Sequence, residues 1–193
     1  MHEQKTGTLI LISSPSGGGK NSVIKKLLDI FSHSTQCITT TTREKRDGEN
    51  NGKDYFFRTR NEFESMMERG AFIETNEYAG NLYGTEKAVL DDFLSHYTIV
   101  FSQADVHGKH SLDKLGIPHL AIFLMPESLD ILKTRIRERG GVSEEKLNER
   151  MKIAEEEMTS SDDYDYRIVN VEGKLEETVA KIGEIIRQYV NHV

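Results

Sequence analysis

The pattern of apolar and polar positions predicts strands and helices that alternate along the 193 residues of the chain. Short apolar runs are typical of buried strands, and apolar residues three and four apart are typical of helices. Residues 71–85 have strand character that a tight turn interrupts. The other strands are predicted at 9–12, 37–42, 55–57, 98–105, 119–126 and 166–170, and the helices at 23–31, 61–69, 86–94, 128–139, 143–158 and 175–189. This order predicts an α/β fold with a parallel sheet.

A glycine-rich turn with the sequence SPSGGGK, residues 14–20, joins the first predicted strand to the first predicted helix. Glycines let the backbone curl so that several N–H groups point at one anion, and the helix N-terminus adds partial positive charge. Lys20 supplies a mobile cation for phosphoryl oxygens. Three glycines and a lysine also occur in ordinary mobile loops, but the strand before them and the helix after them favour a site for nucleotide phosphates.

The turn departs from the phosphate-loop pattern G-x-x-x-x-G-K-[ST] at two positions. Ser14 replaces the first glycine, and a small residue fits there if its backbone needs no positive φ. Asn21 stands where Ser or Thr would ligate Mg²⁺. Its amide oxygen lies farther from the backbone than a hydroxyl, and Mg²⁺ demands near-ideal geometry. Ser22 is the next candidate ligand, although one helical step rotates it by about 100°.

Composition and charge narrow the possible partners and the compartment. The chain has 25 Lys and Arg against 32 Asp and Glu, a net charge of −7, which argues against a broad nucleic-acid surface. The lone Cys37 fits a reducing compartment and a buried apolar position. The N-terminal residues lack the layout of a signal peptide, and no apolar run approaches membrane length. We therefore expect a cytoplasmic protein without a membrane partner, and the oligomeric state, monomer or homodimer, stays open.

Two arginines and a carboxylate are candidate ligand contacts. Arg43 and Arg46 lie three apart in a loop with glycines, where they can clamp a phosphate with paired N–H donors. The alternative is a charged loop that only faces water, and the sequence of this segment, taken by itself, favours that alternative. Glu74 follows two apolar residues and is a candidate buried carboxylate, which a base with adjacent N–H donors such as guanine would satisfy. The alternative for Glu74 is a position on the rim that faces water.

Polar residues end the predicted strand at 98–105. In open α/β sheets the ligand lies beyond the carboxyl ends of the strands, so Gln103 and Asp105 should face the site. His107 and His110 are spaced for one face of a helix, but two histidines without further ligands are a weak signal for zinc.

Arginines gather near the hinge between the predicted helices 128–139 and 143–158. Arg135, Arg139 and Arg150 could close over phosphates and stabilise the charge that develops during transfer. Solvated charges in i,i+4 ion pairs are the alternative for any one of them.

Four motifs in register resemble those of guanylate kinases, the small phosphate-loop enzymes that phosphorylate GMP from ATP. They lie at 14–20, 41–55, 80–85 and 135–140, and the resemblance extends from Leu9 to about Ile186. It implies the α/β fold of phosphate-loop nucleoside monophosphate kinases, with helices flanking a parallel sheet and with an inserted GMP-binding lobe and a lid. The implied boundaries are a single domain, 1–193, with the core at 8–38, 91–131 and 159–190, the lobe at 39–90 and the lid at 132–158.

The resemblance also implies ATP and GMP as substrates, Mg²⁺ carried on the ATP, and a set of site residues. Positions that match the ATP site are Ser14, Pro15, Ser16, Gly17, Gly18, Gly19, Lys20, Asn21, Ser22 and Asn170. Positions that match the GMP site are Thr39, Arg43, Arg46, Glu49, Tyr55, Glu74, Tyr83, Thr85 and Asp105. The implied catalytic residues are Lys20, Arg43, Arg135, Arg139 and Arg150, and the candidate metal ligands are Asn21, Ser22 and Gln103.

The family pattern fails at Gln103 as well as at Asn21. Gln103 replaces the first acidic residue of the family's Asp-x-Asp-x-x-Gly strand end, while Asp105 and Gly108 keep the rest. A neutral amide there removes a negative charge from the outer shell of Mg²⁺. We expect an ATP-dependent guanylate kinase. The alternative is a catalytically impaired module of the same family that binds a nucleotide or a phosphopeptide. A kinase for another nucleoside monophosphate would require a different role for Glu74.

Overall fold

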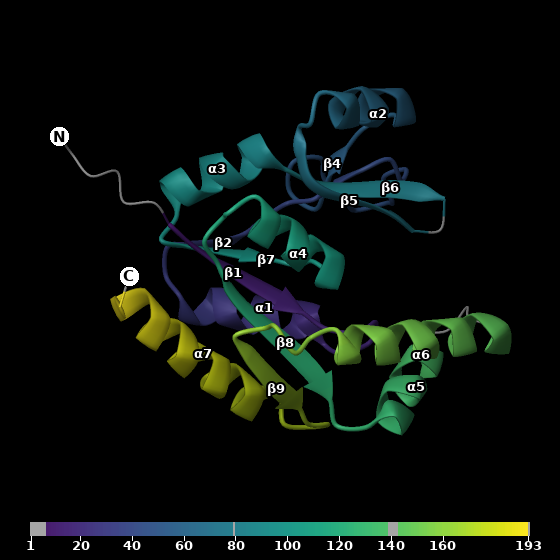
Figure 1. Cartoon of the computed structure of the whole chain (residues 1–193), viewed down its shortest axis with the longest axis vertical. Helices are drawn as coiled ribbons and strands as arrows, with labels where there is room; N and C mark the ends of the chain where they lie inside the picture. The colour runs from purple at the N-terminus through teal and green to yellow at the C-terminus, as the bar shows by residue number, and fades with distance from the viewer. Residues whose placement is uncertain (1–6, 79, 139–142, 193) are drawn as a thin grey trace. The chain divides into compact units, whose positions relative to one another are not determined.

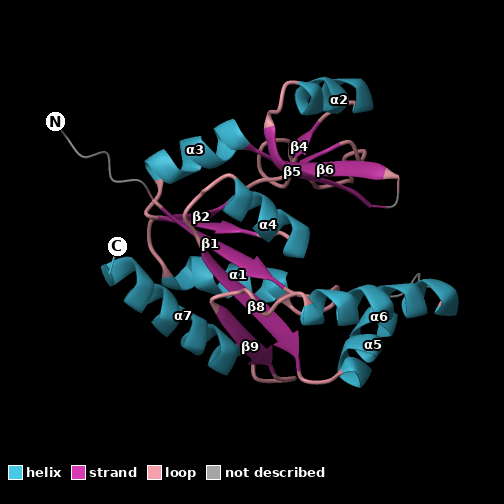
Figure 2. Ribbon diagram, in the orientation of Figure 1, coloured by secondary structure: helices cyan, strands magenta, loops and turns pink. Residues whose placement is uncertain are grey.

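The computed structural model describes residues 7–78, 80–138 and 143–192, and its strands and helices alternate as the apolar pattern predicts (Figure 1). Parallel strands and helices together make this an α/β fold, as Figure 2 shows. The chain divides into two compact units. The first unit consists of Met1–Leu9, His33–Ser102 and His107–Pro118, and the second of Ile10–Ser32, Gln103–Val106 and His119–Val193.

The first unit contains a four-stranded sheet with the strand order β4-β3-β6-β5. β5 (Phe72–Tyr78) and β6 (Asn81–Glu86) form an antiparallel hairpin. β3 (Thr40–Thr41) pairs antiparallel with β6, and β4 (Phe56–Phe57) pairs parallel with β3. The unit also contains the parallel pair β2 (Ser34–Gln36) and β7 (Ile99–Ser102), with the helices α2 (Arg60–Glu68), α3 (Lys87–His96) and most of α4 (Val106–Lys114).

A small apolar core joins α2 to the hairpin. Phe63 of α2 stacks on Phe72 of β5 with ring centroids 4.4 Å apart, and Leu82 of β6 completes the cluster. Gly84 of β6 permits this packing, because a Cβ there would lie 2.8 Å from Phe72 and 3.1 Å from Phe63. The glycine therefore sets how closely α2 approaches the sheet.

The second unit is built on three parallel strands in the order β1-β8-β9. These are β1 (Thr8–Ser13), β8 (Leu120–Pro126) and β9 (Tyr166–Asn170). β1 and β8 are buried almost throughout, which is typical of parallel strands covered by helices. α1 (Lys20–Ile30) and α7 (Leu175–His192) pack against each other, and α7 also contacts β9.

α5 (Leu129–Glu138) and α6 (Glu144–Thr159) pack together through an apolar cluster of their own. The cluster consists of Leu132, Ile136, Leu147 and Ala154. A serine at the start of each helix caps it: Ser128 Oγ accepts a hydrogen bond from Ile131 N at 3.2 Å, and Ser143 Oγ accepts one from Lys146 N at 3.3 Å.

The strand predicted at 37–42 is shorter than expected, because only Thr40–Thr41 pair as a strand, β3. β2 pairs with β7 only as far as Gln36, and pairing resumes in the four-stranded sheet at Thr40, so the intervening residues connect two sheets. Cys37 is nevertheless buried, with 5% of its surface exposed. The predicted strand at 98–105 is shorter than expected and ends at Ser102.

Two apolar side chains, for which the helical spacing in the sequence predicts an inward position, are exposed in the structure. Met67 is 42% exposed, because α2 packs on the sheet through Phe63 and Met66. Ala88 is exposed in α3, whose buried residue is Leu90. None of the helices in the described part of the chain combines the length and the apolar character needed to cross a membrane.

Candidate functional site

The glycine-rich turn between β1 and α1 depends on two glycines in the left-handed region. Gly17 has a φ of 90° and Gly19 a φ of 96°, values that other residues rarely adopt. A Cβ on Gly18 would lie 2.5 Å from Ser14 Oγ, so the buried Ser14 and Gly18 fit only as a pair. Among the described residues other than glycine, only His33 has a positive φ. Ser14 therefore replaces the first glycine of the motif without backbone strain.

α1 begins directly after the turn, and no side chain caps it. Gly19 is the N-cap residue and offers no side-chain acceptor, so the N–H groups of the first turn and the helix dipole favour an anion. Lys20 donates from Nζ to the Ser14 carbonyl oxygen at 2.5 Å, which keeps its ammonium group at the turn. Asn21 and Ser22 follow on the first turn, and both are exposed.

An open pocket of about 380 Å³ lies beside the turn within the second unit. Asn170, buried at the end of β9, donates from Nδ2 to the Gly18 carbonyl oxygen at 3.0 Å. A Cβ on Gly19 would lie 2.6 Å from that nitrogen, so the glycine lets β9 approach the turn. On the pocket wall Arg135 donates from Nε to Glu172 Oε2 at 2.7 Å. The pocket thus combines an ion pair with a backbone site for an anion.

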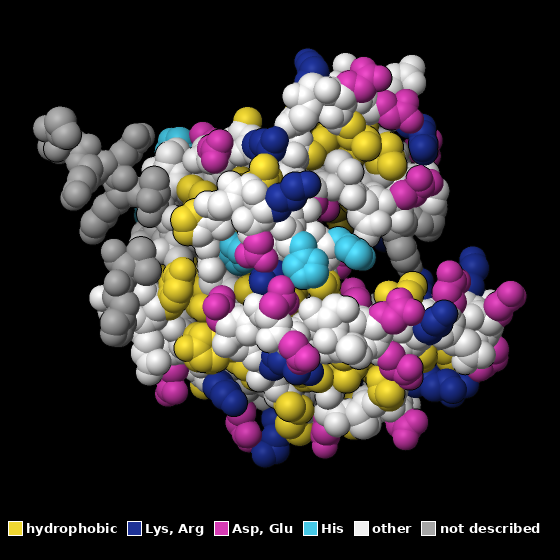
Figure 3. Space-filling view, in the orientation of Figure 1, with side chains coloured by type: hydrophobic (Ala, Val, Ile, Leu, Met, Phe, Trp, Pro, Cys, Tyr) yellow, Lys and Arg dark blue, Asp and Glu magenta, His cyan; other side chains and the backbone are white. Residues whose placement is uncertain are grey.

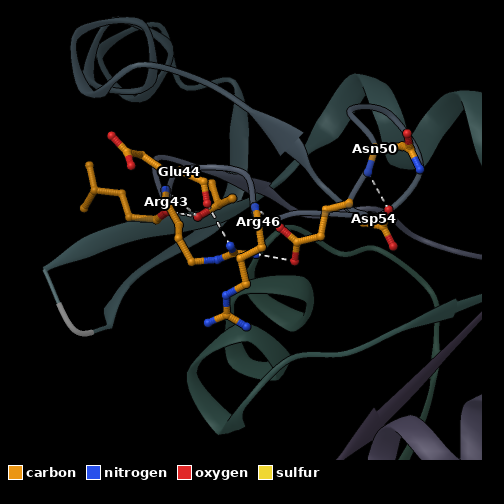
Figure 4. A network of polar contacts seen from close by, with 8 residues as sticks. Arg43, Glu44, Arg46, Asn50 and Asp54 are labelled. Carbon is orange, nitrogen blue, oxygen red and sulfur yellow. Dashed lines mark hydrogen bonds and ion pairs between the residues drawn. The ribbon is translucent and has the colours of Figure 1, made fainter.

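In the first unit, Arg43 is held in place by its neighbours on the loop after β3 (Figure 4). Its Nη2 donates to Glu49 Oε1 at 2.7 Å and its Nη1 to the Glu44 carbonyl oxygen at 2.8 Å. The hydrogen bond from Arg43, and to a smaller degree the one from the backbone N–H of Arg46, lowers the pKa of Glu49. The hydrogen bond to Glu49 in turn raises the pKa of Arg43. Both groups therefore stay charged near neutral pH.

The side chain of Arg46, unlike that of Arg43, is not held by its neighbours on the loop. Its guanidinium points away from that of Arg43 in Figure 4. Within the described part of the chain, this guanidinium makes no hydrogen bond or ion pair, and only the backbone N–H of Arg46 donates to Glu49. One arginine of the loop is thus fixed, and the other is free to meet a ligand.

Aromatic rings surround the fixed arginine. The guanidinium carbon of Arg43 lies 5.3 Å from the centroid of the Tyr55 ring and 5.7 Å from that of Phe57. Tyr55 meets Tyr83 edge-on with centroids 6.3 Å apart, because the β3–β6 register sets Thr41 opposite Tyr83. An arginine flanked by two phenol hydroxyls offers the donors that a phosphate group requires.

The β5–β6 register sets Glu74 opposite Thr85. Thr85 donates from Oγ1 to Glu74 Oε1 at 2.9 Å. Glu74 is half-buried, so its position lies between the two alternatives that the sequence left open, a buried carboxylate and a residue on the rim that faces water. Burial, and to a smaller degree the negative charge of Glu74, raises the pKa of the Cys37 thiol to about 12. The carboxylate therefore borders a region from which water is largely excluded.

Comparison with known proteins decides the family, since the guanylate kinase family model matches residues 6–189. This chain belongs to the guanylate kinase family. The match covers almost the whole chain, including both units.

Individual guanylate kinases are similar over nearly their full length. The guanylate kinase of Rickettsia felis is 38% identical over 180 residues, which are 93% of this chain and 93% of that protein. The guanylate kinase of Oceanobacillus iheyensis is 38% identical over 184 residues, 95% of this chain and 88% of that protein. The similarity therefore spans most of each of these two proteins.

Solved structures confirm the fold predicted from the sequence. The guanylate kinase of Anaplasma phagocytophilum superposes with a TM-score of 0.72 at 31% identity, covering 96% of this chain and 87% of that one. The shikimate kinase of Bacteroides thetaiotaomicron superposes with a TM-score of 0.53 at 16% identity, and this likeness concerns the fold alone.

The residues predicted for the guanylate kinase site fall into both units, and their roles stay predictions. Arg139 lies outside the described residues. The first unit holds Thr39, Arg43, Arg46, Glu49, Tyr55, Glu74, Tyr83 and Thr85. The second unit holds residues 14–22, Gln103, Asp105, Arg135, Arg150 and Asn170.

Sequence reasoning missed two residues that contact this set. Glu172 holds Arg135 across 37 positions of the chain, and no local pattern indicates such a pair. Phe57 lies against Arg43, and here a signal existed, because alternation along a strand sets Phe57 on the same face as Tyr55.

Proposed function

We propose that this chain transfers the γ-phosphoryl group of ATP to GMP, giving ADP and GDP. The observation that carries the proposal is the phosphate loop, with Gly17 and Gly19 in the left-handed region, an uncapped helix behind them and Lys20 at the turn. In a chain of the guanylate kinase family, this geometry supports binding of the phosphate donor.

ATP would lie along the turn of residues 14–19 and in the adjoining pocket. The N–H groups of the first turn of α1 and the Lys20 ammonium would donate to its phosphates. The adenine would lie beside Asn170, whose side chain is already fixed by its hydrogen bond to Gly18. Arg135 lines the same pocket, and with Arg139 and Arg150 it would face the phosphates being transferred.

GMP would bind through its phosphate and its base. Arg43, Arg46, Tyr55 and Tyr83 would hold the phosphate, and Glu49 would keep Arg43 in its binding geometry, which reduces the entropy lost on binding. The remaining predicted contacts are Thr39, Glu74, Thr85 and Asp105.

Guanine recognition would depend on Glu74. Its carboxylate would accept from the adjacent N1–H and N2–H₂ of guanine, while Thr85 fixes its orientation. Adenine has no equivalent pair of donors and would leave the half-buried carboxylate without a partner, so the site disfavours AMP.

The chemical step requires no protein nucleophile. An oxygen of the GMP phosphate attacks the γ-phosphorus in line, a new P–O bond forms, and the bond to the bridging oxygen breaks with its electron pair leaving on ADP. The protein contributes position and positive charge. Lys20 and the arginines of the second unit would balance the charge on the equatorial oxygens.

The oxygen donors near the turn fit Mg²⁺ carried on ATP. Within the described residues no group of three His, Cys, Asp or Glu side chains could hold a metal by itself, but Mg²⁺ on a nucleotide takes most of its ligands from phosphates and water. Asn21, Ser22 and Gln103 offer neutral oxygen donors. When bound, the ion would supply positive charge that offsets the negative charge of the phosphates. Localisation in the cytoplasm likewise stays a prediction.

A coupled assay for ADP formation with ATP, Mg²⁺ and GMP tests the proposal. We expect GMP-dependent turnover of about 1–100 s⁻¹, the usual range of kinases, and almost none without GMP. AMP, UMP and dTMP serve as control acceptors.

Calorimetric titration of the same nucleotides separates binding from catalysis. GMP binding without turnover would contradict the enzyme and support a binding module. Tight AMP binding with none for GMP would overturn the substrate.

A further inference from the structure

A chain of buried hydrogen bonds connects three segments of the second unit. The Tyr164 hydroxyl donates to Ser13 Oγ at 2.8 Å, and Ser13 Oγ donates to the Ala104 carbonyl oxygen at 2.6 Å. Ser13 is fully buried, and Tyr164 is 6% exposed. The described residues contain no buried side-chain nitrogen or oxygen without a hydrogen-bond partner, so this chain is fully satisfied.

Two of the three residues joined by these hydrogen bonds, Ser13 and Ala104, border predicted functional segments. Ser13 is the last residue of β1 and directly precedes the phosphate loop at residues 14–20. Ala104 lies between Gln103 and Asp105, the two polar residues that follow β7. The Ser13–Ala104 hydrogen bond therefore fixes the distance between the backbone of the phosphate loop and that of residues 103–105.

Tyr164 is a rigid anchor for this hydrogen bond. Its ring packs edge-on against Phe123 of β8 with centroids 5.2 Å apart. The next residue, Asp165, accepts from the backbone N–H of Ala121 at 2.7 Å, so the segment is fixed to β8 at two points. Burial, together with the nearby carboxylates of Asp163, Asp105 and Glu157, raises the pKa of Tyr164, so its hydroxyl stays protonated and continues to donate.

The direction of donation in the two hydrogen bonds of Ser13 Oγ determines how its hydroxyl is oriented. Because the Tyr164 hydroxyl occupies an acceptor position of Ser13, the Ser13 proton is directed at the Ala104 carbonyl. Without the tyrosine hydroxyl, Ser13 Oγ could rotate within the turn and the hold on Ala104 would weaken.

We infer that Tyr164 and Ser13 are positioning residues that hold Gln103 near the phosphate loop for the Mg²⁺ form of ATP. The inference rests on the proposed function in one respect, that residues 14–20 bind ATP. It assigns no contact with the nucleotide to Tyr164, which acts only through Ser13 and the backbone of residue 104.

The test is the affinity for ATP, measured by calorimetry with excess MgCl₂ and again with EDTA. Tyr164→Phe keeps the ring on Phe123 and removes only the hydroxyl. We expect it to weaken ATP binding about fivefold with Mg²⁺ and to leave binding in EDTA unchanged, which corresponds to the loss of one neutral hydrogen bond. Tyr166→Phe is the matched control, because Tyr166 lies two residues away and is 41% exposed.

Ser13→Ala provides a second, independent variant. It should reproduce the effect of Tyr164→Phe, and the double variant should be no weaker than Ser13→Ala alone, because both changes interrupt the same chain. Thermal unfolding of each variant verifies that it is folded. Independent effects that add in the double variant would overturn the inference.

Other outcomes separate this inference from the proposed function. If Tyr164→Phe weakens ATP equally with and without Mg²⁺, or behaves as Tyr166→Phe does, the positioning role is overturned. If the unmodified protein binds no ATP, the inference fails together with the ATP site. If it binds ATP and responds as expected but shows no GMP-dependent turnover, only the proposed function fails.

Discussion

At the scale of single residues, Asn21 and Gln103 distinguish this chain from the usual guanylate kinase pattern. Both put a neutral amide where the family pattern has a hydroxyl or a carboxylate, at positions predicted to lie near Mg²⁺. Asn21 does not disturb the fold, since β1, the turn and α1 form as the motif predicts. Ser14 shows that such replacements can be compensated locally, because Gly18 leaves the space that the serine occupies.

Restoring the family residues tests whether the two amides act together. Asn21→Ser and Gln103→Asp should each raise kcat about three- to tenfold and lower the Mg²⁺ concentration needed for half-maximal activity, since a hydroxyl and a carboxylate are better placed near Mg²⁺. If the amides share one water network, the effects in the double variant will not simply add. Turnover measured against Mg²⁺ concentration for the four proteins checks this, and strict additivity would contradict a shared network.

Cys37 should be unreactive in the folded protein. Its thiol is buried and its pKa is raised to about 12, so the nucleophilic thiolate is scarce at pH 8. We expect iodoacetamide to modify it at least about a hundredfold more slowly in the native protein than in urea. Mass spectrometry of the alkylated protein measures both rates, and comparable rates would contradict the burial of this residue.

The same pKa shift has a defined effect on stability. An acid whose pKa is higher in the folded state than its unfolded value of about 8.5 binds more protons when folded, so folding stability falls as pH rises from about 8.5 towards 12. Cys37→Ala should remove this part of the pH dependence. Thermal unfolding between pH 7 and pH 10 compares the two proteins.

At the scale of elements, short local signals begin several helices. α2 begins at a capping box, in which Thr59 Oγ1 accepts from Glu62 N while the Glu62 carboxylate accepts from Thr59 N. This cap fixes the end of the helix whose Phe63 packs on the hairpin carrying Glu74 and Thr85.

Removing the cap should destabilise this region. Thr59→Ala is expected to lower the free energy of unfolding by about 1 kcal/mol, the usual cost of losing a threonine N-cap. Ser65→Ala on the same helix is the control, since Ser65 is exposed and alanine favours helix there. Urea denaturation of both variants measures the difference, and equal stabilities would show that the cap contributes nothing.

At the scale of the whole molecule, the residues predicted for the two substrates belong to different compact units, with the exception of Asp105, which is predicted for GMP but lies in the second unit. Arg43 contacts Glu49 and Tyr55 within the first unit, and the phosphate loop is contacted by Asn170 within the second. A substitution in one cluster should therefore leave the other nucleotide's binary affinity unchanged.

Two variants test this independence. Arg43→Lys should weaken GMP binding about tenfold, since lysine cannot reproduce the ion pair with Glu49 together with the contacts to two rings. Gly19→Ala should weaken ATP binding at least about tenfold, because its φ of 96° and its closeness to Asn170 exclude a side chain. Each variant should bind the other nucleotide normally in calorimetry, and a loss of both affinities in either one would contradict independent sites.

The sequence by itself determined the order of strands and helices, the phosphate loop and the serine caps, because each depends on neighbours within a few residues. Apolar periodicity and the run at residues 14–20 specify local backbone geometry. The same local pattern predicts a strand over 37–42, which the structure shortens to Thr40–Thr41, and an inward Met67, which is exposed. It does not indicate where the chain passes from one sheet to another or which residues α2 uses for packing.

Only the tertiary structure decided which distant side chains meet. Glu172 beside Arg135 and Tyr164 beside Ser13 lie 37 and 151 positions apart, and no periodicity links them. It also decided that Arg43 is fixed while the Arg46 guanidinium points away, although the two stand three apart in one loop. The physical reason is that a hydrogen bond requires its two groups within about 3 Å. The packing of the sheets and helices sets that distance, whereas the sequence determines only which polar groups the chain carries.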